Sequence, residues 1–158
     1  RLLIETKHRD NFSGFSDGTP ALQQLARKVT HGALSYNGDY LFYLEENPES
    51  FADIRFVIPD EGAEKWVDSM MIPAKAPHPE LANAFINFIL DAKVGAQLSN
   101  YNYYASPNAA AAPYLDEVLT QPPIQPSEDD MARLRFSPSL SGQQLQVFQQ
   151  LWSEVQSR

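Results

Sequence analysis

Hydrophobic positions recur every three or four residues along several stretches of the chain, which is the spacing of one face of an α-helix. Residues 78–90 show this pattern most clearly, and their apolar positions on one side are Leu81, Phe85, Phe88 and Ile89. The pattern predicts a second helix over residues 92–100 and a short one over residues 109–115. We therefore expect the middle of the chain to be largely helical.

Capping residues mark the start of two further predicted helices. Thr19 can cap a helix over residues 20–28, and Pro20 suits its first position. Near the other end, Ser141 and Gln144 have the spacing of a capping box. The apolar stripe that follows, which we expect to be buried, comprises Leu145, Phe148, Leu151, Trp152 and Val155.

Two stretches have the composition of β-strands. Residues 31–36 are typical of a short buried strand that ends at the turn pair of residues 37–38, and residues 54–58 are rich in β-branched and aromatic side chains. Between them, Asp39 lies at a predicted helix start, where an acid is favoured by exposed backbone amides. Short strands that alternate with helices predict an α/β fold.

An aspartate lies within an apolar run that extends from Trp66 to Ile72. In an extended segment Trp66 and Asp68 point to the same side, whereas Lys65 points to the other. A carboxylate in apolar surroundings needs a partner, because desolvating it alone costs several kcal/mol. The sequence offers Asp68 no local partner, which leaves a backbone cap, a distant basic residue or a ligand cation.

Composition narrows the range of functions. The 158 residues suffice for a domain with a real core, and 43% are hydrophobic. The formal net charge of −8 disfavours a polyanionic partner such as nucleic acid and is compatible with a cationic partner. No stretch approaches the length of a membrane span, so we expect no direct membrane insertion. The chain begins without methionine, and we expect the polypeptide to start upstream.

The sequence contains few residues that could form a catalytic or metal site. There is no cysteine, and the three histidines do not have the spacing of a zinc motif, so we predict neither a metal nor a cofactor. Residues 14–18 match the G-x-S-x-G pattern of a serine hydrolase, which would make Ser16 the nucleophile. The residues before Ser16 are too polar for the buried strand that this motif requires, so a serine hydrolase is only the alternative from another functional class.

Aromatic side chains are more informative. Tyr101, Tyr103 and Tyr104 crowd a loop rich in Asn and Ser. Rings of this kind beside an acid such as Asp68 would form a box for an ammonium group, with a cation–π attraction of roughly 0.5–2 kcal/mol per ring. The alternative is structural, with Asp68 capping a turn and Trp66 filling an interface between lobes, and residue-level reasoning alone favours this alternative.

Three segments together resemble a known family. The segments NGDYLFYLEENPE, EGAEKWVDSMMIP and YNYYASPNAAA resemble, in order and spacing, the C-terminal part of the periplasmic spermidine/putrescine-binding proteins of ABC importers. The resemblance runs from about Phe15 to the end of the chain. It implies a type II periplasmic-binding-protein-like α/β fold, two lobes with a hinge, of which this chain covers the C-terminal half.

The resemblance also implies how the chain is divided. Residues 1–67 would be a second-lobe segment that ends at the hinge crossing. Residues 68–112 would pack on the first lobe, and residues 113–158 would return to the second lobe with the C-terminal helix. The N-terminal half of the same protein, which supplies the rest of the cleft, would then be missing from this chain.

The same resemblance implies a ligand site and a role. Asp68 would pair with an ammonium group, Tyr36 and Trp66 would flank the methylene chain, and Tyr104 would contact it from the other lobe. Tyr36 stands where a relative has tryptophan, and Ser137 falls near a glutamine contact. The implied function is capture of a polyamine in the periplasm for an ABC permease of the inner membrane, without catalysis. Another small amine, a γ-amino acid or a sensor role is the alternative.

Overall fold

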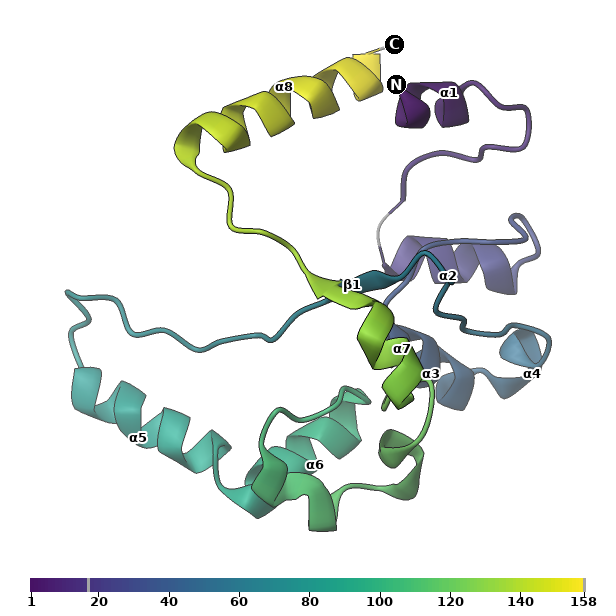
Figure 1. Cartoon of the computed structure of the whole chain (residues 1–158). Helices are drawn as coiled ribbons and strands as arrows, with labels where there is room; N and C mark the ends of the chain where they lie inside the picture. The colour runs from purple at the N-terminus through teal and green to yellow at the C-terminus, as the bar shows by residue number, and fades with distance from the viewer. Residues whose placement is uncertain (17, 158) are drawn as a thin grey trace.

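The computed structural model describes residues 1–16 and 18–157, and Figure 1 shows helices joined by long extended segments. In chain order the elements are α1 (Leu2–Lys7), α2 (Thr19–Ala26), α3 (Asn37–Glu46), α4 (Pro48–Phe51), β1 (Ala63–Lys65), α5 (Pro79–Ile89), α6 (Ala92–Asn102), the 3-10 helices η1 (Ala109–Tyr114) and η2 (Glu117–Thr120), α7 (Glu128–Arg133), β2 (Leu134–Phe136) and α8 (Gly142–Ser157). The structure is thus a set of helices with a small sheet.

That sheet joins two segments that are far apart in the sequence. Strands β1 and β2 run parallel, with Ala63 opposite Leu134 and Lys65 opposite Phe136. The ammonium of Lys65 lies 5.1 Å from the centre of the Phe136 ring, which adds a cation–π contact across the pair. The pairing fixes where the chain leaves each strand, and therefore where residues 66 and 137 lie.

The two strands predicted from composition are wrong. Residues 31–36 and 54–58 form no strand in the structure, and Leu34, which we expected to be buried, is 89% exposed. A strand exists only where a neighbouring backbone completes its hydrogen bonds, and no described segment pairs with either stretch. The proposed cap is also wrong, since α2 starts at Thr19 itself and its N-cap is Gly18.

Helix α3 lies between two small hydrophobic cores. Tyr40 packs with Leu22 of α2 and Phe51 of α4 in one core. The adjacent Leu41 packs in the other core with Leu119 and Ile124. Neighbouring positions on a helix point about 100° apart, so α3 contacts both cores at once. The start of α3, which carries the site described below, is therefore held from two sides.

The predicted helices of the middle and end of the chain are confirmed, including the capping box, in which the Ser141 amide donates to Gln144 Oε1 at 2.8 Å. The predicted burial of the α8 stripe is wrong for most of its positions. On α5, Leu81 is 68% exposed and Phe85 58% exposed, and most of the α8 stripe is also exposed. Periodicity predicts which residues share a face, but the described residues leave the α5 face largely uncovered and cover the α8 face only near its C-terminal end, at Trp152 and Val155.

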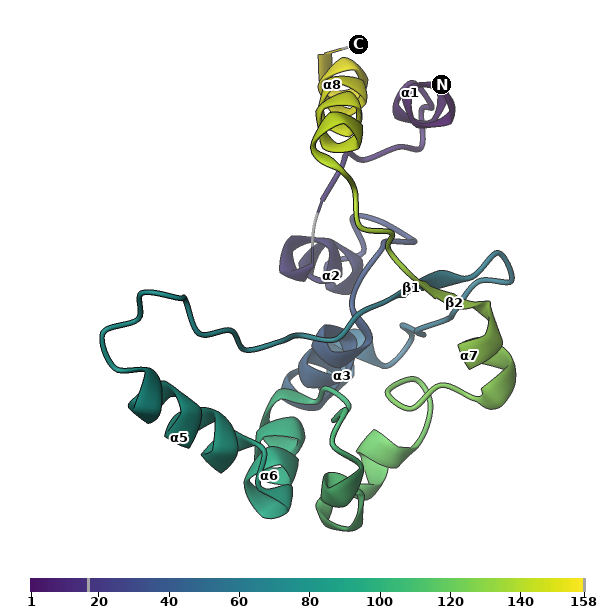
Figure 2. The same ribbon diagram turned by 60° about the vertical axis from the view of Figure 1, so that its left-hand side comes forward.

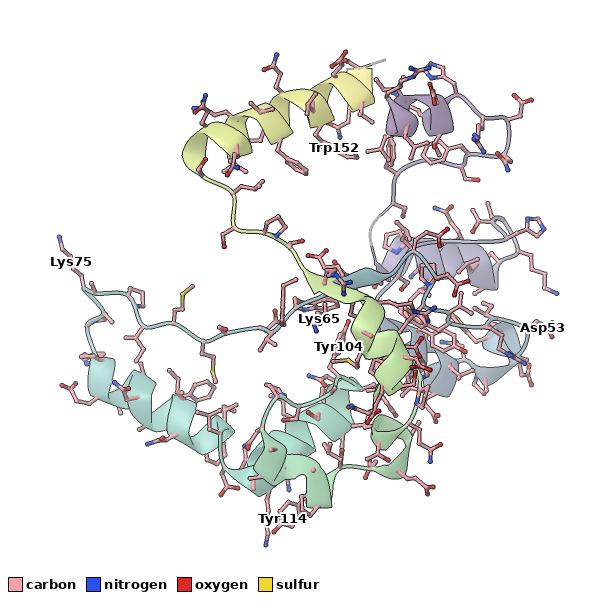
Figure 3. The ribbon with its side chains drawn as sticks, viewed as in Figure 1. Asp53, Lys65, Lys75, Tyr104, Tyr114 and Trp152 are labelled. Atoms are coloured by element: carbon pink, nitrogen blue, oxygen red, sulfur yellow. The ribbon has the colours of Figure 1, made fainter. Side chains whose placement is uncertain are left out.

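The two ends of the described chain meet. The Lys7 ammonium donates to the carbonyl oxygens of Val155 at 3.1 Å and Gln156 at 2.7 Å, which caps the end of α8. The Trp152 ring lies 5.1 Å from the Phe15 ring, centre to centre. Figures 1 and 2 both show α1 beside the C-terminal end of α8. In Figure 3, Trp152 lies on the side of α8 that faces the N-terminal segment of the chain.

Candidate functional site

Two aromatic rings from distant segments meet at the start of α3. Tyr36 is the N-cap residue of that helix, and its ring meets the Trp66 ring edge to face, with centroids 5.0 Å apart and planes at 67°. Trp66 directly follows β1, so the parallel pairing of β1 with β2 sets its position. Both side chains are about 40% exposed, at 40% and 42%, so each keeps a surface that a ligand can contact.

A hydrogen bond joins the start of α3 to the loop after α6. The Tyr104 hydroxyl donates to Oδ1 of Asp39 at 2.7 Å. The Tyr104 ring lies directly over Gly38, because a Cβ built on that glycine would stand 2.5 Å from the ring atom Cδ2. No larger residue fits at Gly38 without displacing the ring. Figure 3 shows Tyr104 near the centre of the molecule, where these segments converge.

The Tyr104 hydroxyl keeps its proton at physiological pH. Burial first, and then the hydrogen bond to Asp39, raise the pKa of Tyr104 well above its usual value. The group therefore acts as a donor to the carboxylate throughout the neutral range. Asp39 itself lies in the first turn of α3, where exposed backbone amides favour a negative charge.

Asp39 is the site residue that sequence reasoning missed. We interpreted it only as an acid at a helix start, although the sequence held a further signal, since it lies three residues after Tyr36 and thus one turn along. Its other oxygen, Oδ2, lies 3.6 Å from the place that a Cβ on Gly18 would take. One oxygen of the carboxylate thus bonds to Tyr104, and the other borders the space beside Gly18, which the Tyr36 ring also borders.

Asp68 lies two residues beyond Trp66 and is exposed. Over residues 1–16 and 18–157, no hydrogen bond or ion pair to its carboxylate is formed, by a backbone amide, an arginine or a lysine. Two of the three partners that the sequence left open, a backbone cap and a basic residue, are therefore not used by the described chain. Because Asp68 is exposed, water can solvate its carboxylate, so the expectation of apolar surroundings is wrong and a ligand cation as its partner stays a prediction.

The sheet register brings Ser137 to the same strand end as Trp66, but the Ser137 hydroxyl is already hydrogen-bonded to a carboxylate. Because Lys65 pairs with Phe136, the residues that follow them, Trp66 and Ser137, leave the two strands at the same end. The Ser137 hydroxyl donates to the carboxylate of Glu64. Both residues line a shallow pocket of about 280 Å³ together with two arginines of the same region.

The described part of the chain contains neither the strand–serine arrangement of a hydrolase, nor a cluster of metal ligands, nor a helix that could span a membrane. Ser16 is exposed and follows irregular backbone, whereas a nucleophile elbow needs a buried strand there; Asp17 of this motif lies outside the described residues. No three acidic or histidine side chains among the described residues come together as metal ligands. None of the described helices combines the length and apolar character needed to cross a bilayer.

The chain is similar in sequence to several known proteins. The family model for bacterial extracellular solute-binding proteins matches residues 10–133. The chain is 30% identical over 129 residues, 79% of its length, to the putrescine-binding periplasmic protein SpuD of Pseudomonas aeruginosa, of which it covers 35%. It is 30% identical over 152 residues to spermidine/putrescine-binding periplasmic protein 1 of Haemophilus influenzae, covering 96% of this chain and 41% of the relative.

A third relative differs in the ligands that its name gives. The chain is 32% identical over 105 residues, 66% of its length, to a putrescine/agmatine-binding protein of Pseudomonas aeruginosa, of which it covers 29%. The chain thus spans well under half the length of each of these relatives. Putrescine ends in two ammonium groups, whereas agmatine carries one ammonium and one guanidinium, so the name of the third relative adds a guanidinium ligand to putrescine.

Proposed function

The chain belongs to the family of bacterial extracellular solute-binding proteins, and on this premise we propose that it forms one side of a cleft that captures a polyamine for an ABC importer. The family resemblance inferred from its sequence motifs is confirmed by the matches to polyamine-binding relatives. These relatives are binding proteins, which agrees with a role without catalysis. The observation that carries the proposal is that the Trp66 ring, from a distant segment, meets the Tyr36 ring at the start of α3, the same helix start that carries Asp39.

The chemistry of the site matches that of a diamine. Polyamines alternate ammonium groups with hydrocarbon, so a complementary site alternates carboxylates with ring faces. The Tyr36 and Trp66 rings would provide an apolar wall, and the carboxylates of Asp39, which shares the space beside Gly18 with Tyr36, and of Asp68, two residues after Trp66, would anchor ammonium groups. Tyr104 orients Asp39, and we place Ser137 at the rim, next to Trp66 in the sheet register.

We further propose the division of the chain that the family fold implies. Residues 1–67 and 113–158 would belong to the second lobe, and residues 68–112 would pack on the first lobe, which the remainder of the protein supplies. The exposed apolar face of α5 supports this division, since such a face needs a partner in water. Figure 2 shows α5 at the end of the extended segment that leaves β1.

The remaining partners follow from the same proposal. The binding protein would act in the periplasm and deliver its ligand to an ABC permease in the inner membrane. The net charge of −8 supports a cationic ligand and opposes nucleic acid.

Calorimetric titration of the complete protein tests the proposal. We expect putrescine or spermidine to bind and uncharged 1,4-butanediol, which has the same hydrocarbon chain as putrescine, to give no heat of binding. Tighter binding of γ-aminobutyrate than of either polyamine would instead identify an amino-acid-binding protein. Absence of binding by all the amines would refute the proposed function.

Replacing Asp68 with asparagine is expected to weaken binding of the preferred polyamine at least tenfold, which is about 1.4 kcal/mol. The substitution keeps the size of the side chain and removes a charge that no described residue neutralises. The measurement is the dissociation constant of the complete protein by calorimetry. Asp10→Asn, an exposed change near the start of the chain, is the control and should leave affinity unchanged. Equal affinities for the two variants would show that Asp68 does not contact the ligand.

A further inference from the structure

The two oxygens of the Asp39 carboxylate have different surroundings. Oδ1 accepts the hydrogen bond from the Tyr104 hydroxyl at 2.7 Å. Oδ2 faces Gly18, where a Cβ would stand 3.6 Å from this oxygen and 3.8 Å from Cε2 of Tyr36. A glycine at position 18 therefore leaves room beside Oδ2, next to the Tyr36 ring.

Tyr104 is held firmly in its position. Its ring lies directly over the backbone of Gly38, and its own amide donates to the side chain of Asn102 at 3.0 Å. Gly38 is buried in α3, whose following residues Tyr40 and Leu41 enter the two cores. The hydroxyl therefore reaches Asp39 from a fixed direction, and its side of the carboxylate is covered by the ring.

We propose that the Tyr104 hydroxyl makes Asp39 selective for a primary ammonium over a guanidinium at this end of the ligand, an inference that rests on the function proposed above. A guanidinium binds a carboxylate best as a planar fork, with one N–H on each oxygen. An ammonium is a compact charge that is satisfied by a single oxygen. Because Tyr104 engages Oδ1 and no described residue bonds to Oδ2, Asp39 offers the ligand a single oxygen, which suits the ammonium.

The test compares two symmetrical ligands, putrescine and 1,4-diguanidinobutane. They share a four-carbon chain, and neither can turn around to offer Asp39 a different group. In the complete protein we expect putrescine to bind at least tenfold more tightly than 1,4-diguanidinobutane. The ligand ratio is the dissociation constant for 1,4-diguanidinobutane divided by that for putrescine, both measured by calorimetry at neutral pH. The variant Tyr104→Phe keeps the ring on Gly38 and frees Oδ1, and we expect the ligand ratio to fall at least fivefold in it.

Tyr114→Phe is the matched control, because it removes a hydroxyl from an exposed tyrosine that lies away from Tyr104 (Figure 3). Its ligand ratio should equal that of the unmodified protein. Either of two results would overturn the inference and leave the proposed function standing. One is an unchanged ligand ratio in Tyr104→Phe, and the other is tighter binding of 1,4-diguanidinobutane than of putrescine by the unmodified protein. If the unmodified protein binds neither of these compounds, the inference is overturned, and if it also fails to bind spermidine, the polyamine function itself is wrong.

Discussion

Replacing Asp39 with asparagine is expected to weaken putrescine binding by about 100-fold, or roughly 2.7 kcal/mol. Asparagine retains the size of the side chain and an oxygen that can accept from Tyr104, so the variant removes the charge and little else. Asp39 is half-buried and accepts a hydrogen bond from Tyr104, and at such a position water screens an ion pair less than at an open surface. We therefore expect a larger loss than for the exposed Asp68.

The measurement is calorimetric titration of the complete protein with putrescine, with the free energy of unfolding determined in parallel. Asp53→Asn is the control, since Asp53 is exposed and lies at the edge of the molecule, away from Tyr104 (Figure 3). Affinity within threefold of the unmodified protein in Asp39→Asn would show that this carboxylate serves the fold. A matching loss in Asp53→Asn would point to a general effect of net charge.

Truncating Phe51 to alanine is expected to lower the free energy of unfolding by about 3–5 kcal/mol. Phe51 is 2% exposed, and its ring stacks on that of Tyr43 with centroids 5.9 Å apart. It also packs against Tyr40 in the core that holds α3. Helix α4 spans only Pro48–Phe51, so this one side chain provides most of its anchorage.

Urea unfolding of the complete protein, followed by circular dichroism, measures this change. Leu34→Ala removes a similar apolar side chain at a site that is 89% exposed, and its effect should stay within about 0.5 kcal/mol. A loss below about 1 kcal/mol in Phe51→Ala would mean that this core closes over the cavity or contributes little.

These two predictions are connected through α3. The helix places Tyr40 and Leu41 in two cores, and the residue before them, Asp39, at the site. A rigid helix start is what allows Tyr36, Asp39 and the ring over Gly38 to keep fixed relative positions. We therefore expect damage to the core to weaken ligand binding as well, whereas damage to the site leaves the core intact.

Local patterns were sufficient to predict the helices. The apolar spacing in residues 78–90 and the capping box at Ser141 act over one or two turns, and both predictions are confirmed. The motifs around Tyr36, Trp66 and Tyr104 were likewise sufficient to identify the family, because they lie in a particular order along the chain.

Tertiary structure alone decided which segments pair and which carboxylate meets which ring. Strands β1 and β2 are three residues each and lie about seventy residues apart, so neither is visible in the local sequence. The stretches at 31–36 and 54–58 have the composition of strands but no partner in the described chain. The hydrogen bond from Tyr104 to Asp39 also joins distant segments. It requires a glycine at position 38, because any larger residue would displace the Tyr104 ring. Such contacts form only when the chain folds back on itself, and no local pattern records them.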